Sequence, residues 1–382
     1  MTEENSKKIL FILGFMEGHI TSSIKLVEDL VSLGLNIYCY IFEQFVERFK
    51  NTGAKLKVIS YNKNLSQNGI SDMHFSMFRA LESILSQAEK DQEKYDYLLV
   101  DSLYDGKAMN KIFKASTVIS IQTLQQIYYT EDFIKQSEEG LVELIGSLNK
   151  KYNIDMKVPC DIVAHPNADY KLVLTSKEFQ SSKVPIDDSF YFIGPSSFEE
   201  RPKDKSFPFK KDPNKKLIYI SLGTLFNNNI DFFKMCIKAF AFSKEFQIIM
   251  SVGKSLDLKV FGNPPDNVFI YNYVPQHEIV KEAEIFISHG GLNSINERLL
   301  LSKKPLIVVP QFGDQFANAD QIKLFEAGIV LEKEKVNEDV LKNAVNSIIA
   351  KEEKYNKGVQ KIIQSFEKAK NERKSILKKI FN

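Results

Sequence analysis

A short polar segment within residues 285–301 has the residue types and the spacing of an anion site. The apolar, β-prone run 285–287 predicts a buried strand, which ends just before His289, Gly290 and Gly291; helical periodicity follows from residue 292. A strand that ends in glycines at a helix start leaves backbone N–H groups unpaired and points the positive end of the helix dipole at a ligand. The segment therefore predicts a site for a phosphate or a diphosphate.

Polar side chains on the predicted helix extend this site. His289, Asn293 and Ser294 add hydrogen-bond donors at the helix start. Glu297 lies seven residues after Gly290, which places it two turns further along the same helix face, at a distance of about 10 Å. A carboxylate in that position suits the hydroxyls of a ribose while the helix start holds a diphosphate.

A second polar group follows the next predicted strand, 306–309. Asp314 and Gln315 come within six residues of its end. Carboxyl ends of parallel strands meet at one edge of an open α/β sheet, and ligands bind beyond that edge. We therefore expect a nucleotide-sugar site at this edge, with capping of the following helix as the alternative role for Asp314 and Gln315.

A candidate general base lies near the start of the chain. His19 follows the first predicted strand, 8–13, and Asp101 ends the fourth, 96–101. A neutral imidazole can take a proton from a hydroxyl, and a carboxylate beside it can fix its tautomer and stabilise the imidazolium. From the residues alone, a purely structural role for His19 stays open.

Alternating strands and helices must position these side chains. Apolar runs typical of strands occur at 8–13, 35–42, 56–60, 96–101, 117–121, 170–174 and 191–193, and again at 217–221, 247–251, 267–271, 285–287 and 306–309. Helical periodicity between them predicts parallel sheets with helices on both sides. Residues 131–148 read as a helix without a place in the sheet order.

A chain of 382 residues exceeds the size at which one core stops growing, so two domains are expected. We assign 1–195 to an N-terminal Rossmann-like domain and 216–357 to a C-terminal one. The Ser-, Pro-, Lys- and Asp-rich stretch 196–215 reads as an interdomain linker. The basic, amphipathic segment 358–382 is expected to be a helix that packs back on the N-terminal domain, with a membrane-surface helix as the alternative.

Composition narrows the function. A net charge of +2 with scattered lysines gives no argument for binding nucleic acid. Cys39, Cys160 and Cys236 are too widely spaced for a metal pattern or a disulfide framework. The apolar run 9–16 is too short to span a bilayer and the polar start is unlike a signal peptide, so we expect a cytoplasmic protein without stable membrane insertion. The absence of D-x-D, of G-x-G-x-x-G after the first strand and of a Walker motif disfavours manganese, nicotinamide and ATP chemistry.

Three ordered blocks, YVPQ at 273–276, SHGGLNSINE at 288–297 and PQFGDQ at 310–315, resemble the donor-binding signature of UDP-glycosyltransferases of the GT-B type. The likeness is greatest to the bacterial macrolide glycosyltransferase (MGT) subfamily. It implies an α/β fold of two Rossmann-like domains facing across a cleft, with the acceptor on the N-terminal domain and the nucleotide sugar on the C-terminal one. It also implies inverting transfer of a hexose, glucose being the first expectation, from a UDP-sugar co-substrate without a metal or another cofactor.

The resemblance also implies roles for individual residues. His19 would be the general base and Asp101 its partner, although the residues after His19 and Ile20 are Thr21-Ser22-Ser23, where a proline is common in relatives. The implied nucleotide-sugar site comprises Ser221, Gly223, Thr224, Tyr273, Val274, Gln276, His289, Gly290, Gly291, Asn293, Ser294, Glu297, Asp314 and Gln315. Within it, Tyr273 would stack on the uracil, and Asp314 and Gln315 would bind hydroxyls of the sugar.

The acceptor site is the least specific prediction. Aromatic and methionine side chains gather near the N-terminal loops, namely Phe15, Met16, Phe75, Met77, Phe78 and Tyr104. An apolar pocket would suit a small hydroxyl-bearing macrolide, flavonoid or other natural product, and core packing is the alternative for about half of these residues. Two other functions stay open: a UDP-sugar 2-epimerase, which shares the architecture, and a non-catalytic sugar-nucleotide-binding protein.

Overall fold

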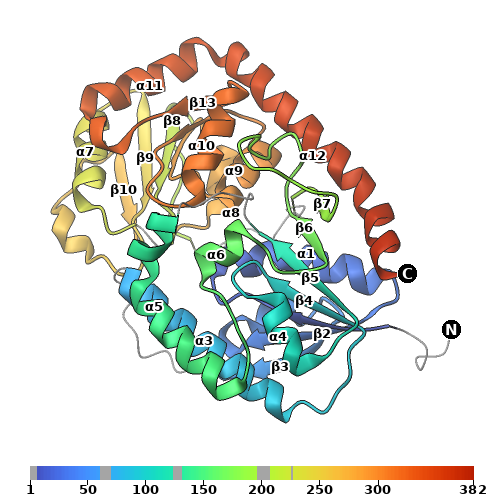
Figure 1. The fold of residues 1–382 in the computed structure, drawn as a ribbon. Coiled ribbons are helices and arrows are strands. Elements are labelled where there is room, and N and C mark those ends of the chain that lie inside the picture. Colours follow the sequence, from blue (N-terminus) through green and yellow to red (C-terminus); the bar gives the residue numbers. More distant parts are fainter. Residues whose placement is uncertain (1–6, 61–69, 124–130, 196–206, 225–226) are drawn as a thin grey trace. The chain divides into compact units, whose positions relative to one another are not determined.

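In a computed structural model, the residues that the structure describes are 7–60, 70–123, 131–195, 207–224 and 227–382. The chain divides into two compact units, Met1–Ser197 with Phe366–Asn382, and Phe198–Ser365. Each unit has its own parallel sheet (Figure 1) and its own hydrophobic core. The prediction of two Rossmann-like α/β units is confirmed.

The sheet of the first unit follows the predicted apolar runs. Its described strands are β1 (Lys8–Ile12), β2 (Asn36–Phe42), β3 (Lys55–Ile59), β4 (Tyr97–Asp101), β5 (Thr117–Gln122), β6 (Tyr170–Val173) and β7 (Phe190–Phe192), in the order β3-β2-β1-β4-β5-β6-β7. Strand order reverses between β1 and β4, which pair directly, with Ile12 opposite Val100. This pairing brings the loop after β1 beside the end of β4, the place where ligands of open α/β sheets bind.

Helices cover this sheet. They are α1 (Glu17–Ser32), α2 (Val46–Phe49), α3 (Ile70–Lys90), α4 (Gly106–Phe113), α5 (Glu131–Tyr152) and α6 (Pro159–Ala164), with a 3-10 turn at η2 (Glu43–Phe45). Helix α5, which the sequence pattern left without a place, packs along α3 (Figure 1). Its residues Leu141, Ile145 and Leu148 are spaced to lie on one helix face, and they are buried in the core of the first unit.

The sheet of the second unit repeats this plan. Its described strands are β8 (Lys216–Ser221), β9 (Phe246–Ser251), β10 (Val268–Tyr271), β11 (Ile285–Ser288), β12 (Leu306–Val308) and β13 (Gly328–Val330), in the order β10-β9-β8-β11-β12-β13. The order reverses between β8 and β11, where Ser221 lies opposite Ser288. The turns that follow these two strands are therefore neighbours.

The helices of the second unit match the predicted positions closely. They are α7 (Ile230–Phe240), α8 (Gln276–Glu282), α9 (Leu292–Glu297), α10 (Asp314–Leu324) and α11 (Glu338–Ala350), with short turns η3 (Leu258–Phe261) and η5 (Lys333–Lys335). Asn337 caps α11, because its side chain accepts a hydrogen bond from the N–H of Val340 at 2.9 Å. The helix predicted from residue 292 continues past α9 as a π-helical turn, η4 (Arg298–Ser302).

The expected linker, 196–215, is described only from residue 207 onward. Residues 196–206 lie outside the described part of the chain, and residues 207–215 pack on the second unit. The ring of Phe207 lies 5.0 Å from that of Tyr271, and the ring of Phe209 lies 5.3 Å from that of Phe269. The two aromatic contacts thus attach the segment 207–215 to the second unit.

The last helix, α12 (Glu352–Phe381), begins six residues before the expected position 358 and belongs to both units, which divide it after Ser365. Its apolar residues Val359, Ile362, Phe366 and Leu377 are buried within the protein. Because these side chains are buried, the apolar face of α12 is not exposed to a membrane surface. The alternative of an interfacial helix is therefore not supported. Among the described residues, none of the helices has the length and apolarity that a bilayer span requires.

Candidate functional site

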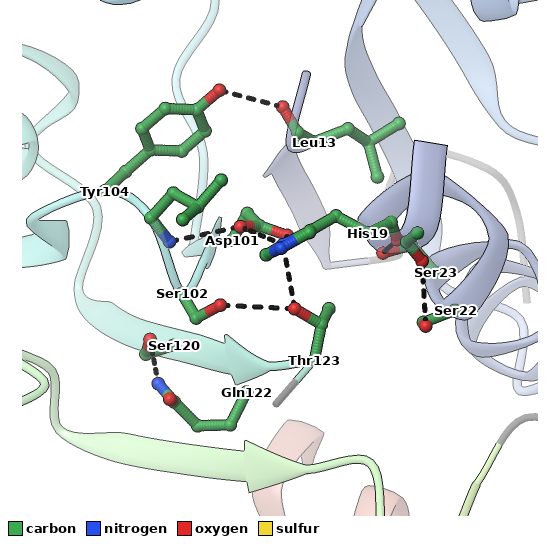
Figure 2. Close-up of polar contacts among 12 residues, drawn as sticks. Leu13, His19, Ser22, Ser23, Asp101, Ser102, Tyr104, Ser120, Gln122 and Thr123 are labelled. Carbon is green, nitrogen blue, oxygen red and sulfur yellow. Dashed lines mark hydrogen bonds and ion pairs between the residues drawn. The ribbon is translucent and has the colours of Figure 1, made fainter. Parts of the chain in front are cut away.

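An imidazole and a carboxylate meet where the strand order of the first unit reverses. His19, the third residue of α1, places Nδ1 at 2.8 Å from Oδ1 and 3.0 Å from Oδ2 of Asp101, the last residue of β4 (Figure 2). Both side chains are buried. An ionised carboxylate can only accept hydrogen bonds, so Nδ1 carries the hydrogen and Nε2 carries the lone pair. This tautomer is the one that a general base needs.

Gly14, the second residue after β1, permits this close approach. A Cβ at residue 14 would lie 2.9 Å from both Oδ2 of Asp101 and Cβ of His19, closer than real Cβ atoms come to other groups. The backbone N–H of Leu103 donates to Oδ1 of Asp101 at 3.1 Å, which fixes the carboxylate. Gly14 was not among the predicted site residues, and its only signal in the sequence is its place directly behind the first strand.

The departure from the family pattern at Thr21-Ser22-Ser23 does not disturb α1, the helix that carries His19. Thr21 lies inside α1, where its hydroxyl donates to the carbonyl of Glu17 at 2.9 Å and accepts from Arg48 at 2.7 Å. Ser23 Oγ donates to the carbonyl of His19 itself at 2.9 Å. Local hydroxyl-to-carbonyl bonds of this kind are compatible with a helix.

Of the six residues predicted to line an acceptor pocket, two belong to the core of the first unit. Met77 and Tyr104 are buried, and the hydroxyl of Tyr104 donates to the carbonyl of Leu13 at 3.4 Å. The other four are half-buried, namely Phe15, Met16, Phe75 and Phe78. The interpretation as core packing therefore holds for Met77 and Tyr104, and a pocket lined by the remainder stays a prediction.

In the second unit, the turns after β8 and β11 close around His289. A Cβ at Gly223 or at Gly291 would lie 2.6 Å from Nε2 of this imidazole. Gly223 and Gly290 also have φ angles of +80° and +85°, which favour glycine. Gly223 and Gly291 are thus required because the imidazole occupies the space that their side chains would need, whereas a Cβ at Gly290 would meet Cγ1 of Val308 at 2.6 Å.

His289 itself is half-buried, and its Nδ1 is buried. Burial lowers the pKa of this imidazole to about 4, and the backbone of Ser221 acts in the opposite direction. His289 is therefore neutral near pH 7. A neutral imidazole can hold an anion by donating one hydrogen bond, without adding a positive charge.

The start of α9 lies at the same place. Gly291 is its N-cap residue and, as a glycine, has no side chain that could cap the helix. Ser221 is buried and accepts from the N–H of Gly223 at 3.3 Å, whereas Thr224 is exposed. Asn293 is half-buried and Ser294 is buried. The two turns thus bring together the residues that the sequence assigned to a diphosphate.

Gln276 links the residues assigned to the nucleoside. Its Nε2 donates to Oε2 of Glu297 at 2.6 Å and lies 3.2 Å from Oγ of Ser294. Its Oε1 accepts from the hydroxyl of Tyr219 at 3.0 Å. Tyr219 is a core residue of β8 that stacks on Phe286 with ring centroids 4.8 Å apart, and burial raises the pKa of its hydroxyl. The carboxylate of Glu297 is therefore held by a hydrogen-bond chain that starts in the core.

Tyr273 is 62% exposed, an unusual state for an aromatic ring next to a strand end. Its neighbour Val274 is buried, which anchors the backbone of this loop. An exposed ring on an anchored loop is available for stacking on a planar ligand. Stacking of Tyr273 on a base stays a prediction.

The loop before α10 is organised by side chains of the helix itself. Oε1 of Gln315 accepts from the N–H groups of Gln311 and Phe312 at 2.8 and 3.1 Å. Asn318 donates to the carbonyl of Gly290 at 2.9 Å and to Oδ2 of Asp314 at 3.0 Å. The N-cap residue of α10 is Gly313, so neither Asp314 nor Gln315 occupies the capping position, and the side chain of Gln315 instead holds the turn before the helix. Asn318 was not predicted, although its spacing of four from Asp314 places both on one helix face.

A buried arginine directly follows Glu297. Arg298 is fully buried and donates to the carbonyls of Val280, Ala283, Glu284 and Pro305 at 2.7–3.2 Å. Burial lowers its pKa to about 9, so the guanidinium stays charged at pH 7. It satisfies carbonyls at the C-terminus of α8, the helix whose first residue is Gln276. Arg298 therefore holds α8 and α9 together behind the predicted nucleoside contacts.

Comparisons with known proteins agree with this picture of the chain. Residues 223–379 match the model of the glycosyltransferase family 28 C-terminal domain. The chain is 30% identical over 369 residues to an uncharacterized UDP-glucosyltransferase, YojK, of Bacillus subtilis (strain 168), and the match covers 89% of both proteins. It is 32% identical over 353 residues to the NDP-glycosyltransferase YjiC of the same organism, covering 88% of this chain and 87% of the relative.

The fold has solved counterparts as well. The crystal structure of the glycotransferase of kitacinnamycin superposes with a TM-score of 0.75 at 22% identity, over 97% of each chain. At that identity the match speaks for the architecture alone, which is the two-unit GT-B arrangement expected from the sequence blocks.

Proposed function

Since this chain belongs to the UDP-glycosyltransferase family and is a glycosyltransferase, we propose that it transfers a hexose from a UDP-sugar to a hydroxyl of a small apolar acceptor. Glucose is the first sugar to test, because one Bacillus relative is named a UDP-glucosyltransferase. A macrolide, a flavonoid or another natural product with a free hydroxyl would serve as the acceptor.

The geometry of the second unit supports a UDP-sugar as the donor. The uncapped start of α9 and the turn at Gly223 supply backbone N–H groups for the diphosphate, and His289 adds a neutral donor. The exposed ring of Tyr273 would stack on the uracil, and Glu297 would accept from the ribose hydroxyls. Asp314 and Gln315 would bind the hexose.

The contact between His19 and Asp101 is the observation that carries the proposed mechanism. Asp101 keeps the hydrogen on Nδ1, so Nε2 of His19 takes the proton of the acceptor hydroxyl. The acceptor oxygen then forms a bond to the anomeric carbon while the bond from that carbon to the diphosphate oxygen breaks, and UDP leaves with the bonding electrons. Attack opposite the leaving group inverts the anomeric carbon.

The leaving diphosphate needs stabilisation as negative charge develops on it. We propose that the start of α9, His289, Ser294 and Thr224 supply it through fixed hydrogen-bond donors. This assignment needs no metal ion, in keeping with a sequence that lacks a D-x-D pair. The proton that His19 takes from the acceptor hydroxyl passes to solvent after each turnover.

The test begins with thermal unfolding of the protein in the presence of a panel of nucleotide sugars. The most stabilising donor is then incubated with an acceptor panel, and UDP release is measured for the wild type and for His19→Ala. We expect turnover to fall by about 10²–10⁴-fold in the variant while the donor still stabilises the protein. Equal turnover in His19→Ala would remove His19 from the mechanism.

A matched control is available in the same unit. His165 is exposed and pairs with Asp161 at 3.2 Å on the surface, so His165→Ala should leave turnover unchanged. The loss in His19→Ala should also shrink for phenolic acceptors that ionise at the assay pH, since these need no base. A new epimer formed from UDP-N-acetylglucosamine without any acceptor would instead support a 2-epimerase.

A further inference from the structure

A buried hydroxyl shares Nδ1 of His19 with Asp101. Oγ1 of Thr123, the residue directly after β5, lies 2.8 Å from Nδ1 of His19 (Figure 2). Oγ of Ser102, the residue directly after β4, lies 3.2 Å from the same Thr123 oxygen. Thr123 is 4% exposed and Ser102 is fully buried. Neither residue belongs to the pair that the sequence pattern identified.

The number of hydrogens at Nδ1 determines which way this chain of hydroxyls points. Nδ1 has one hydrogen, and Asp101 can only accept it. Were Thr123 to donate to Nδ1, the nitrogen would present a lone pair to a carboxylate 2.8 Å away, which is repulsive. Thr123 must therefore offer its own lone pair to the N–H of His19 and send its hydrogen elsewhere.

Ser102 is placed to take that hydrogen. Its oxygen is within hydrogen-bond distance of Thr123, and its backbone N–H donates to the carbonyl of Ile121 at 3.0 Å, which fixes the end of β4 against β5. A hydroxyl that donates to a second hydroxyl is a better acceptor, because hydrogen bonds in a chain polarise one another. The result is a hydrogen bond to Nδ1–H that is shared between a carboxylate and a threonine from two neighbouring strands.

We propose that Thr123, held by Ser102, is a positioning residue that fixes the plane and the tautomer of the His19 imidazole. This inference rests on the proposed role of His19 as the base. Asp101 and Thr123 approach Nδ1 from the ends of different strands, so together they restrict rotation of the ring about its bond to Cβ. As His19 becomes an imidazolium, its Nδ1–H becomes a stronger donor, and both acceptors stabilise the charged ring.

The test compares three variants, of which the two Thr→Val substitutions keep the side-chain volume. Thr123→Val keeps the branched shape and removes the hydroxyl, whereas Thr123→Ser keeps the hydroxyl. Thr175→Val is the matched control. Thr175 lies two residues after the neighbouring strand β6 and is buried like Thr123. Within the described part of the chain, its Oγ1 has no hydrogen-bond partner. Each is assayed with UDP-glucose and 4-methylumbelliferone, at a pH where that phenol is protonated.

We expect kcat to fall about five- to tenfold in Thr123→Val, with the KM for UDP-glucose unchanged, and to recover in Thr123→Ser. Thr175→Val should keep the wild-type kcat. In an Asp101→Asn background, the effect of Thr123→Val should shrink, since both groups act through the same N–H. Wild-type kcat in Thr123→Val, or equal losses in Thr123→Val and Thr175→Val, would overturn the proposal.

A readout without substrate separates this proposal from the catalytic role of His19. The chain has five histidines, so with ¹⁵N-labelled histidine the imidazole of His19 can be assigned by its loss in His19→Ala. The Nδ1–H signal should shift and exchange faster with water in Thr123→Val but not in Thr175→Val. An unchanged signal in Thr123→Val overturns the positioning role. An active His19→Ala would overturn the proposed function, and the spectrum would still decide whether Thr123 holds the ring.

Discussion

His289 and Gly223 are in contact across the two strand ends where the order of the second sheet reverses. A Cβ at residue 223 would lie 2.6 Å from Nε2 of the His289 imidazole, and the φ angle of Gly223 is +80°. The same ring excludes a side chain at Gly291, so one imidazole determines the residue type on both adjacent turns. Substitution of either glycine must therefore move the ring, the turn or both.

Gly223→Ala tests this relationship. We expect the affinity for UDP to fall about tenfold or more, because the turn that faces the predicted diphosphate must shift to relieve the clash. Isothermal titration calorimetry with UDP measures the change. Gly262→Ala is the control, since Gly262 also has a positive φ of +64° but has no atom within 4 Å of the added Cβ. Both variants should lose stability from backbone strain, but only Gly223→Ala should lose affinity for UDP.

Glu297→Gln tests the assignment of the ribose. The wild type should bind UDP more tightly than 2′-deoxy-UDP, and the variant should bind UDP about tenfold more weakly because a charged acceptor is lost. The loss should be smaller for 2′-deoxy-UDP if Glu297 contacts that hydroxyl. Equal losses for both nucleotides would instead indicate that Glu297 acts through the chain of Gln276 and Tyr219.

The depressed pKa of His289 predicts how stability depends on pH. Its pKa is about 4 in the folded protein and 6.5 for an ordinary histidine, so between these values the unfolded chain binds a proton that the folded one does not. Stability should therefore decrease as the pH falls from about 6.5 to about 4. Urea unfolding of His289→Gln should show a weaker decrease over that window. At pH 7.5 histidine is neutral in both states, so any difference there reports packing alone.

Arg298→Met should destabilise the second unit. The substitution keeps much of the side-chain volume and leaves the carbonyls of Val280, Ala283, Glu284 and Pro305 without their buried donor. Several unsatisfied carbonyls cost about 3–5 kcal/mol together, which corresponds to a decrease in Tm of roughly 6–15 °C for a unit of this size. Differential scanning calorimetry measures it.

A surface pair serves as the control for that prediction. Lys335 pairs with Glu332 at 2.6 Å in an exposed turn, and Lys335→Ala should change Tm by about 1 °C or less. A wild-type Tm in Arg298→Met would show that water replaces the guanidinium at these carbonyls. In that case Arg298 would not be what holds α8 against α9.

The order of strands and helices and the position of the donor turn could be predicted from local pattern. Strands buried on both faces read as continuous apolar runs, and a strand that ends in His289, Gly290 and Gly291 before a helix predicts an anion site. The pairing of His19 with Asp101 could be predicted because His19 follows the first strand and Asp101 ends the fourth, and the carboxyl ends of these parallel strands share one sheet edge. These features depend on neighbours in the chain or on the general rules of parallel sheets.

Contacts between residues far apart in the chain could not be predicted in this way. Thr123 lies 104 residues after His19, and nothing in the spacing of the two indicates that a hydroxyl reaches Nδ1. The same holds for Asn318 and the carbonyl of Gly290, for Gln276 and Glu297, and for Arg298 and its four carbonyls. The sequence by itself determined which strand ends hold the predicted site residues, because backbone geometry repeats from one sheet to another. Only the tertiary structure decided which side chains support that chemistry, because their hydrogen bonds depend on packing between distant segments.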